Sequence, residues 1–317
     1  MKNLIVSPSP HLVSRTDTRA IMAHVLIALA PALVMSVVIF GVRALVVSLV
    51  CVTACVLCEF AFQKGCKRPV TTGDLSACVT GLLLAFNLPV SIPLWQAVFG
   101  SVVAIIVVKQ LFGGIGQNFA NPAITARIVM LIAFSGTMTT WTHLDAVSSA
   151  TPDAVSSATP LAVLSRHFSG AVAEGLPPLK DMLLGFHGGS LGETCALALL
   201  IGGIYLMARR IIAWHTPVAM VGTVFLFTLI MGANPVYHLL SGGLLLGALF
   251  MATDYATTPS TPWGRVIFGI GCGLITVLIR LWGNYPEGVS FAILLMNILT
   301  PHISNLTRKK PMGGDAA

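Results

Sequence analysis

The stretch AIMAHVLIALAPALVMSVVIFG, residues 20–41, contains no Asp, Glu, Lys or Arg. A helix of this length rises about 33 Å, enough to cross the ~30 Å hydrocarbon core of a bilayer. The whole chain is similar in character, since 56% of its 317 residues are hydrophobic and 9% are charged, against roughly 25% charged in a soluble domain. Residues 1–19 are polar and carry Lys2, Arg15 and Arg19, which is unlike a secretory signal peptide. We therefore expect residues 20–41 to remain as a membrane span.

Further apolar runs follow along the chain and define candidate spans. These lie near 20–41, 43–62, 75–91, 95–112, 121–136, 190–208, 212–232, 237–253, 265–283 and 288–304. The third, fifth and eighth are short for a crossing of about 20 residues. The runs are continuously apolar rather than alternating, which favours helices over a β-barrel. The sequence predicts an all-α polytopic membrane protein with about ten transmembrane helices.

The basic residues predict the orientation of these helices. With a cytoplasmic N-terminus, most Lys and Arg residues fall on the cytoplasmic side, so the positive-inside rule places both termini there. The opposite side receives Arg43, Arg166, Lys180 and Arg280, and Arg127 lies within a span. The pI of about 9.2 follows from this topology and does not indicate nucleic-acid binding.

This topology divides the chain into five parts. They are a cytoplasmic N-terminal segment (1–19), a first five-helix half (20–136), an outward-facing loop (137–189), a second five-helix half (190–304) and a cytoplasmic tail (305–317). Because each half has an odd number of spans, any internal repeat must be inverted. WQAVFGSVVAIIVVKQLFGG (95–114) and WGRVIFGIGCGLITVLIRLWG (263–283) are similar and occupy corresponding places. We therefore expect two five-helix inverted repeats.

A second corresponding pair consists of short, Gly/Pro-interrupted segments. They are GDLSACVTGLLLAFNLPVSIP (73–93) and SGGLLLGALFMATDYATTPSTP (241–262). Such interrupted spans at matching positions of two halves are typical of a central pathway or ligand site. Glycine at these positions is equally expected where helices pack closely. Both interpretations stay open.

The octamer DAVSSATP occurs twice without a gap, at 145–152 and 153–160, in the predicted outer loop. Ser and Asp side chains bond nearby backbone groups, and a residue before proline is disfavoured in a helix. The octamers alone therefore indicate a turn-rich loop. A threonine hydroxyl is a poor nucleophile without an activating group, so Thr-Pro by itself indicates no chemistry.

The pattern Asp-x-x-Ser-x-Ala-Thr within each octamer resembles a flavin attachment motif. At this motif a flavin transferase esterifies FMN, through its phosphate, to threonine in the NqrB/RnfD family, the large membrane subunits of the sodium-translocating NADH:quinone oxidoreductase and of the Rnf ion-translocating oxidoreductase complex. The short N-terminal segment resembles the Rnf branch of this family in particular. The resemblance extends through SPSPHL (7–12), GGIGQNFANPA (113–123), GGSLGETCALALLIGGIYL (188–206), FMATDYATTP (250–259) and YPEGVSFAILLMNILTP (285–301).

The resemblance implies a function and its partners. The chain would be a multi-pass subunit in the inner (cytoplasmic) membrane, with covalent FMN on the outer face. Electrons would pass between NADH and ferredoxin, coupled to Na⁺ or H⁺ transport. The flavin would supply the redox chemistry and the protein its attachment and surroundings. Other subunits of the Rnf-type complex, a flavin transferase during maturation and membrane lipid are the implied partners. A non-covalent riboflavin is also implied, although no motif locates it.

The resemblance assigns Thr159 as the FMN acceptor. Thr159 is followed by Pro-Leu-Ala, as in the family, whereas the alternative acceptor Thr151 is followed by Pro152 and Asp153. Asp153 is expected to act in recognition or activation by the transferase. The motif residues Ser156, Ser157 and Ala158 are expected to let the loop enter that enzyme in extended form. None of these residues is expected to be catalytic in the finished protein.

Cysteine and histidine give weaker signals. Cys51, Cys55 and Cys58 share one helix face, but four ligands are lacking, so buried packing is the favoured interpretation. No metal site and no disulfide are predicted. Ionisable residues in or near spans need a partner, water or a pathway, and a structural ion pair is as good an explanation as ion transfer. They are Glu59, Lys109, Arg127, Glu193, Asp254 and Glu287.

Two functions from different classes remain. One is a redox subunit of an ion-translocating complex, which is not expected to be catalytic alone. The other is a stand-alone channel or solute carrier on the same inverted scaffold, without a redox function. Only the first accounts for the two copies of the acceptor pattern.

Overall fold

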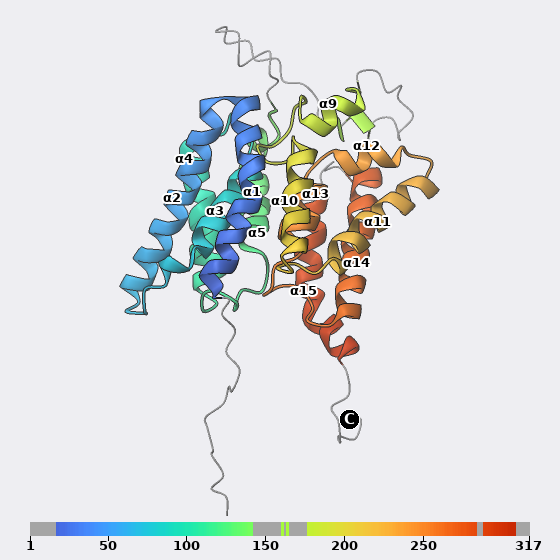
Figure 1. The fold of residues 1–317 in the computed structure, drawn as a ribbon. Coiled ribbons are helices and arrows are strands. Elements are labelled where there is room, and N and C mark those ends of the chain that lie inside the picture. Colours follow the sequence, from blue (N-terminus) through green and yellow to red (C-terminus); the bar gives the residue numbers. More distant parts are fainter. Residues whose placement is uncertain (1–16, 142–159, 162, 165–175, 284–287, 309–317) are drawn as a thin grey trace, which may run out of the picture.

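The computed structural model describes residues 17–141, 160–161, 163–164, 176–283 and 288–308, and none of these lies in a β-strand. Two groups of helices stand side by side. Where they meet, α1 of the first group lies next to α10 of the second (Figure 1). The N-terminal part of the chain forms the first group, and the C-terminal part forms the second group. The predicted all-α polytopic membrane architecture is confirmed.

The first group contains long helices and shorter, interrupted ones. Gly41, with φ of 72°, ends α1 and begins α2, and Asn121 caps α5 by accepting from the backbone N–H groups of Ala123 and Ile124. The elements are α1 (Thr18–Phe40), α2 (Val42–Gly65), the 3₁₀ turn η1 (Thr72–Asp74), α3 (Ser76–Phe86), α4 (Leu94–Val102), its π-helical continuation η2 (Val103–Gln110), α5 (Pro122–Ala133) and α6 (Ser135–Met138).

The second group begins with a short helix and contains one strongly interrupted segment. Its elements are α9 (Leu179–Leu184), α10 (Ala196–Ala208), α11 (His215–Ile230), α12 (Pro235–Leu240), α13 (Leu244–Leu246) with its π-helical continuation η3 (Gly247–Met251), α14 (Pro262–Trp282) and α15 (Val289–Thr307). The predicted span 237–253 is thus divided at residues 241–243. Helix α12 lies across the end of the bundle, and α13 and η3 enter it (Figure 1).

The spans differ in length from the predicted set. In the described part of the chain, α1, α2, α14 and α15 are long and apolar enough to cross a membrane, and α3, α4–η2, α5, α10 and α11 are shorter apolar helices. The predicted third span ends as a helix at Phe86, and the predicted sixth begins as a helix only at Ala196. The number of ten transmembrane helices therefore stays a prediction.

Corresponding helices of the two groups run in opposite directions. We call the end where α1 begins and α15 finishes the termini end, and the end where α9 and α12 lie the distal end (Figure 1). Helix α14 begins at the termini end, where Thr261 Oγ1 lies 2.6 Å from Thr307 Oγ1, whereas α4 begins at the distal end. Helices α1 and α10 are likewise antiparallel, since His24 early in α1 contacts Tyr205 late in α10. This agrees with the predicted inverted repeats.

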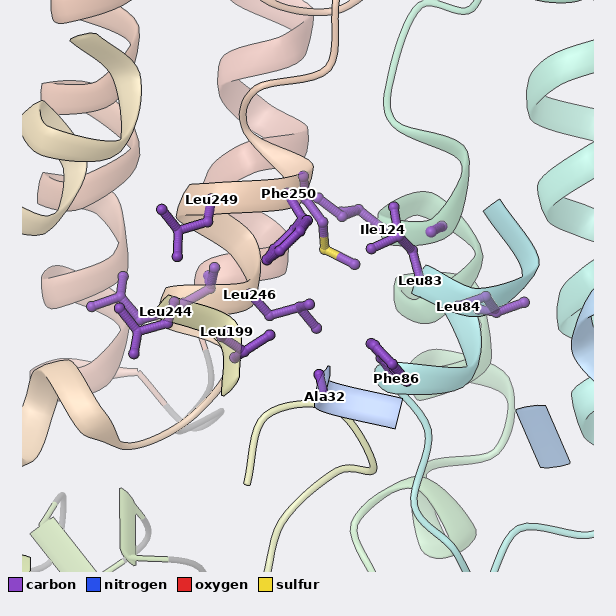
Figure 2. Packing of buried hydrophobic residues seen from close by; sticks show 14 of the residues in the cluster. Ala32, Leu83, Leu84, Phe86, Ile124, Leu199, Leu244, Leu246, Leu249 and Phe250 are labelled. Atoms are coloured by element: carbon purple, nitrogen blue, oxygen red, sulfur yellow. The ribbon is translucent and has the colours of Figure 1, made fainter. Parts of the chain in front are cut away.

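Part of the contact between the groups is tight and apolar. Figure 2 shows Leu83 and Phe86 of α3 and Ile124 of α5 across from Leu199 of α10 and Phe250 of η3. A Cβ on Gly202 would lie 2.1 Å from the carbonyl oxygen of Ala28, so glycine is required where α10 crosses α1. Small residues at such contacts are typical of membrane helices, which associate through close packing.

Candidate functional site

The two interrupted segments of the sequence meet where the groups join. Asn87, which ends α3, has its Nδ2 atom 3.7 Å from the sulfur of Met251 at the end of η3. Asn121 Nδ2 donates to the carbonyl oxygen of Met251 at 3.2 Å. The helices end here because Asn87 and Pro89 interrupt the first and the turn after Met251 interrupts the second. The structure therefore brings together the paired segments that the sequence pointed to.

Around this junction lies a group of buried ionic side chains. Arg127 of α5 is 4% exposed, and its Nη1 donates to Asn87 Oδ1 at 2.7 Å. Glu193, in the turn before α10, is also 4% exposed and accepts from the backbone N–H of Ser190 at 3.2 Å. A Cβ on Gly243 would lie 3.2 Å from Glu193 Oε2 and 3.5 Å from Arg127 Nη1. Side chains of both groups of helices thus converge on the backbone before α13.

Arg280 completes this group from the end of α14. It is 1% exposed, and its guanidinium donates to the carbonyl oxygens of His238 at 2.5 Å and Ser241 at 3.0 Å. His238, on α12, is 2% exposed and lies next to the Arg280 guanidinium through its own carbonyl oxygen. We call Arg127, Glu193, His238 and Arg280 the distal ionic cluster.

A second buried network lies at the termini end of the first group. Lys109 Nζ is 2.9 Å from Glu59 Oε1 and 2.6 Å from Ser76 Oγ. Gln110 Nε2 donates to the same Glu59 oxygen at 2.6 Å, and Ser76 Oγ donates to Asp74 Oδ1 at 2.6 Å. Glu59 and Lys109 thus form a structural ion pair, one of the two interpretations that the sequence left open.

A cavity of about 340 Å³ opens at the termini end between the groups. Its wall is largely apolar, with Met22, Leu83 and Phe250, and it includes the polar residues Asn118 and Asp254. Burial raises the pKa of the Asp254 carboxyl, against the effect of hydrogen bonds from the backbone N–H of Ala256 and the side chains of Thr257 and Asn118. An apolar cavity of this size with a few convergent polar groups is typical of a small-molecule site.

The predicted attachment residues are not among those that the structure describes. Thr151, Asp153, Ser156, Ser157, Ala158 and Thr159 lie in residues 142–159, outside the described residues, as does Glu287. Two residues after Thr159, the side chain of Leu161 is described and is 2% exposed. A Cβ on Gly242 would lie 3.0 Å from Leu161 Cδ2 and 3.0 Å from Arg280 Nη2. The chain just after Thr159 is thus packed beside the distal ionic cluster.

The cysteines differ in burial, and Cys66 is exposed. All seven are free, and Cys51 and Cys55 are fully buried in α2. Within the described residues, no three His, Cys, Asp or Glu side chains are grouped so that they could hold a metal ion.

Sequence reasoning missed the roles of Arg280, Asn87 and His238. The positive-inside rule places Arg280 on the outer side, whereas the structure buries it against loop carbonyls. The signal that would have found it is its position inside the apolar run VLIRLW, 277–282. An arginine in such a run requires polar partners.

The fold and the buried ionic groups define a polytopic membrane protein whose two inverted groups of helices meet at a polar junction. The profile of the NQR2, RnfD, RnfE family matches residues 5–313. The chain belongs to this family.

Three named relatives are similar in sequence to this chain along nearly their full lengths. The chain is 48% identical to the D subunit of the Na(+)-translocating ferredoxin:NAD(+) oxidoreductase complex of Acetobacterium woodii, over 98% of this chain and 96% of that protein. It is 42% identical to the D subunit of the proton-translocating ferredoxin:NAD(+) oxidoreductase complex of Clostridium ljungdahlii, over 98% and 97%. It is 41% identical to the D subunit of the ion-translocating oxidoreductase complex of Stutzerimonas stutzeri, over 95% and 94%.

Proposed function

We propose that this chain is the D-type membrane subunit of an ion-translocating oxidoreductase complex and that it carries FMN in phosphoester linkage on Thr159. The relatives named above are subunits of such complexes, two of them acting between ferredoxin and NAD⁺. The chain would work as a translocase subunit together with the other subunits of its complex, and it would transfer electrons coupled to Na⁺ or H⁺ movement.

The acceptor pattern that ends at Thr159 supports the attachment, and the burial of Leu161 supports the position of the attached group. Two residues after Thr159, the buried side chain of Leu161 packs at Gly242. Two residues of chain reach at most about 7 Å. A flavin on Thr159 would therefore be tethered close to the junction of the helix groups. Thr151 is ten residues from Leu161, a reach of about 35 Å, so a flavin there would be far less confined.

The proposed orientation follows from the same tether. Helix α1 begins and α15 finishes at the termini end, whereas α9 and α12 lie at the distal end (Figure 1). Leu161 packs at Gly242, which follows α12 in the chain. With both termini in the cytoplasm, the FMN would face the outer side of the inner membrane. The flavin would supply the redox chemistry, and the chain would hold it at a fixed depth.

We propose that the implied non-covalent riboflavin occupies the cavity at the termini end. Its volume of about 340 Å³ falls within the usual range for small-ligand pockets. Leu83 and Phe250 offer apolar surface to an isoalloxazine, and Asn118 and Asp254 offer hydrogen-bonding groups to its polar edge or ribityl chain. The two flavins would then lie toward opposite ends of the bundle, as a path across the membrane requires.

A denaturing gel viewed under ultraviolet light tests the covalent flavin. The chain coexpressed with a flavin transferase should fluoresce at its own band, and Thr159→Val should be dark while Thr151→Val stays bright. A dark wild-type band refutes the redox proposal and favours the alternative of a stand-alone channel or solute carrier. A bright Thr159→Val band moves the flavin to Thr151.

Acid precipitation tests the riboflavin separately, since only non-covalent flavin enters the supernatant. Wild-type protein should release about one riboflavin per chain by chromatography. Leu83→Trp fills the cavity and should abolish this release while the fluorescent band remains. A matched control is Leu229→Trp, because Leu229 is 55% exposed on α11 and away from the cavity. Full release from Leu83→Trp would contradict the placement.

A further inference from the structure

We propose that a second cavity at the termini end binds the phosphate group of an anionic membrane lipid, and that Arg210 and Arg265 hold this group. The cavity has a volume of about 510 Å³ and lies between the turn after α10 and the turn that leads into α14. It adjoins the cavity proposed for riboflavin, whose lining contains neither arginine. The inference does not depend on either flavin.

Exposed tryptophans place this cavity at the level of the lipid headgroups. Trp263 in the first turn of α14 is 74% exposed, and Trp282 at its end is 58% exposed. The helical rise between them is about 29 Å, close to the ~30 Å thickness of the hydrocarbon core, and tryptophan is enriched at both membrane surfaces. Trp214 and Arg265 line the cavity, and Arg265 follows Trp263 by two residues. The cavity therefore lies where lipid phosphates lie.

The two arginines have donors to spare. Arg265 Nε donates to the carbonyl oxygen of Pro259 at 3.1 Å, and its two terminal nitrogens make no hydrogen bond or ion pair with the described residues. The Arg210 side chain likewise makes neither with any residue that the structure describes. A guanidinium with free nitrogens binds phosphate oxygens in a bidentate manner.

The backbone of Arg210 is in a conformation that arginine rarely adopts. Its φ is 56°, in the left-handed region that glycine favours after the end of a helix. Two hydrogen bonds fix this turn, from Arg210 N–H to the Met207 carbonyl at 2.9 Å and from Ile211 N–H to the Leu206 carbonyl at 3.0 Å. An arginine kept where glycine would be less strained indicates a role for its side chain.

The cavity is held in shape and one helix begins at it. The Tyr255 hydroxyl donates to the Ile211 carbonyl oxygen and so joins the two turns. Helix α11 begins beside Trp214 and has no side-chain cap, whereas Thr261 caps α14 by accepting from the Gly264 N–H at 3.1 Å. The uncapped first turn of α11 offers N–H groups and the positive end of its dipole to an anion.

Among the described residues that line the cavity, Asp254 is the acidic one. Its carboxyl already accepts from the backbone N–H groups of Tyr255 and Ala256 and from the side chains of Thr257 and Asn118. The carboxyl is thus paired within the protein. Two arginines and one carboxyl leave the cavity with a positive net charge, as a phosphate group requires.

The alternative is that both arginines act only through the general positive charge of this surface. Arg209 would then contribute as much as its neighbour Arg210. Arg209 is outside the lining of the cavity, and its Nη2 lies 3.3 Å from His24 Nε2. Arg209→Gln is therefore the matched control, because it removes the same charge from the same turn.

The test measures the melting midpoint of the delipidated full-length chain in detergent, with added dioleoylphosphatidylglycerol or the zwitterionic dioleoylphosphatidylcholine. The anionic lipid should raise the wild-type midpoint by several degrees more than the zwitterionic lipid. Arg210→Gly and Arg265→Gln should each lose most of this difference, and Arg209→Gln should keep it. Arg210→Gly separates binding from folding, because glycine suits the φ of 56°, and this variant should melt no lower than the wild type without lipid.

Four results would overturn the inference. The first is an equal rise with both lipids, and the second is a full anionic-lipid rise in the double variant Arg210→Gly, Arg265→Gln. The third is a loss in Arg209→Gln as large as that in Arg210→Gly, which would mean that general surface charge is sufficient. The fourth is a rise of the same size with sodium phosphate alone, which would assign the cavity to free phosphate.

Discussion

Lys109 Nζ lies 2.9 Å from Glu59 Oε1, and the two side chains are 4% and 1% exposed. The pair joins the last turn of η2 to α2, and Gln110 and Ser76 complete the bonds around it. A buried ion pair adds little stability compared with two apolar side chains of similar size. Removing one partner, however, leaves the other charge buried alone, which destabilises the fold.

Lys109→Met should therefore destabilise the protein strongly, by about 3–5 kcal/mol. Glu59→Gln combined with Lys109→Met removes both charges and should recover most of this loss. Lys64→Met, at an exposed position over the Phe60 ring, should change stability by less than about 0.5 kcal/mol. Thermal unfolding in detergent measures all three. Equal losses in the single and double variants would mean that the charges are not coupled.

The close crossing of α1 and α10 predicts that replacing Gly202 destabilises the protein. A Cβ on Gly202 would lie 2.1 Å from the Ala28 carbonyl oxygen, whereas nothing lies within 4 Å of one on Gly222 in α11. Gly202→Ala should cost about 1–3 kcal/mol because the helices must move apart. Gly222→Ala should be neutral or slightly stabilising, since alanine favours helix. A Gly202→Ala protein with the wild-type melting midpoint would contradict the close packing.

Asp254 should give the stability a specific dependence on pH. Its pKa is raised in the folded protein, first by burial, so the folded state disfavours the carboxylate relative to the unfolded chain. Wild-type stability should then fall as pH rises from the ordinary carboxyl pKa of about 4 through the raised value. Asp254→Asn cannot titrate and should not show this fall.

The measurement is the melting midpoint of both proteins from pH 4 to pH 8. The difference should be smallest at pH 4 and should grow in favour of Asp254→Asn as the pH rises. Parallel curves would show that Asp254 has the same pKa in the folded and unfolded chain.

Mass spectrometry of the peptide from residues 144 to 166 should resolve the duplicated motif. We expect one FMN on Thr159 and unmodified Thr151, because Leu161 fixes the chain next to the second copy. In Thr159→Val, the peptide should carry no flavin. Two flavins on the wild-type peptide would show that the transferase accepts both copies equally.

Several features follow from the sequence alone. The uncharged run at 20–41 and its repetition along the chain required membrane helices, because unpaired backbone groups and charges are too costly in lipid. The paired interrupted segments predicted a central meeting point, and the structure joins them at Asn87 and Met251. The odd number of predicted spans in each half also predicted the inverted arrangement. These properties depend on composition and periodicity, which are local.

Only the tertiary structure decided which charged side chains pair with which partners. Glu59 and Lys109 are 50 residues apart, and nothing in either span marks the other as its partner. Arg280 has the sequence signature of a topology signal, yet the fold buries it against His238 and Ser241. Leu161 lies in a stretch of ordinary loop composition, yet it packs beside Arg280 at Gly242. The reason is physical: pairing within a membrane depends on how helices far apart in sequence pack, and many partners satisfy the same hydropathy pattern.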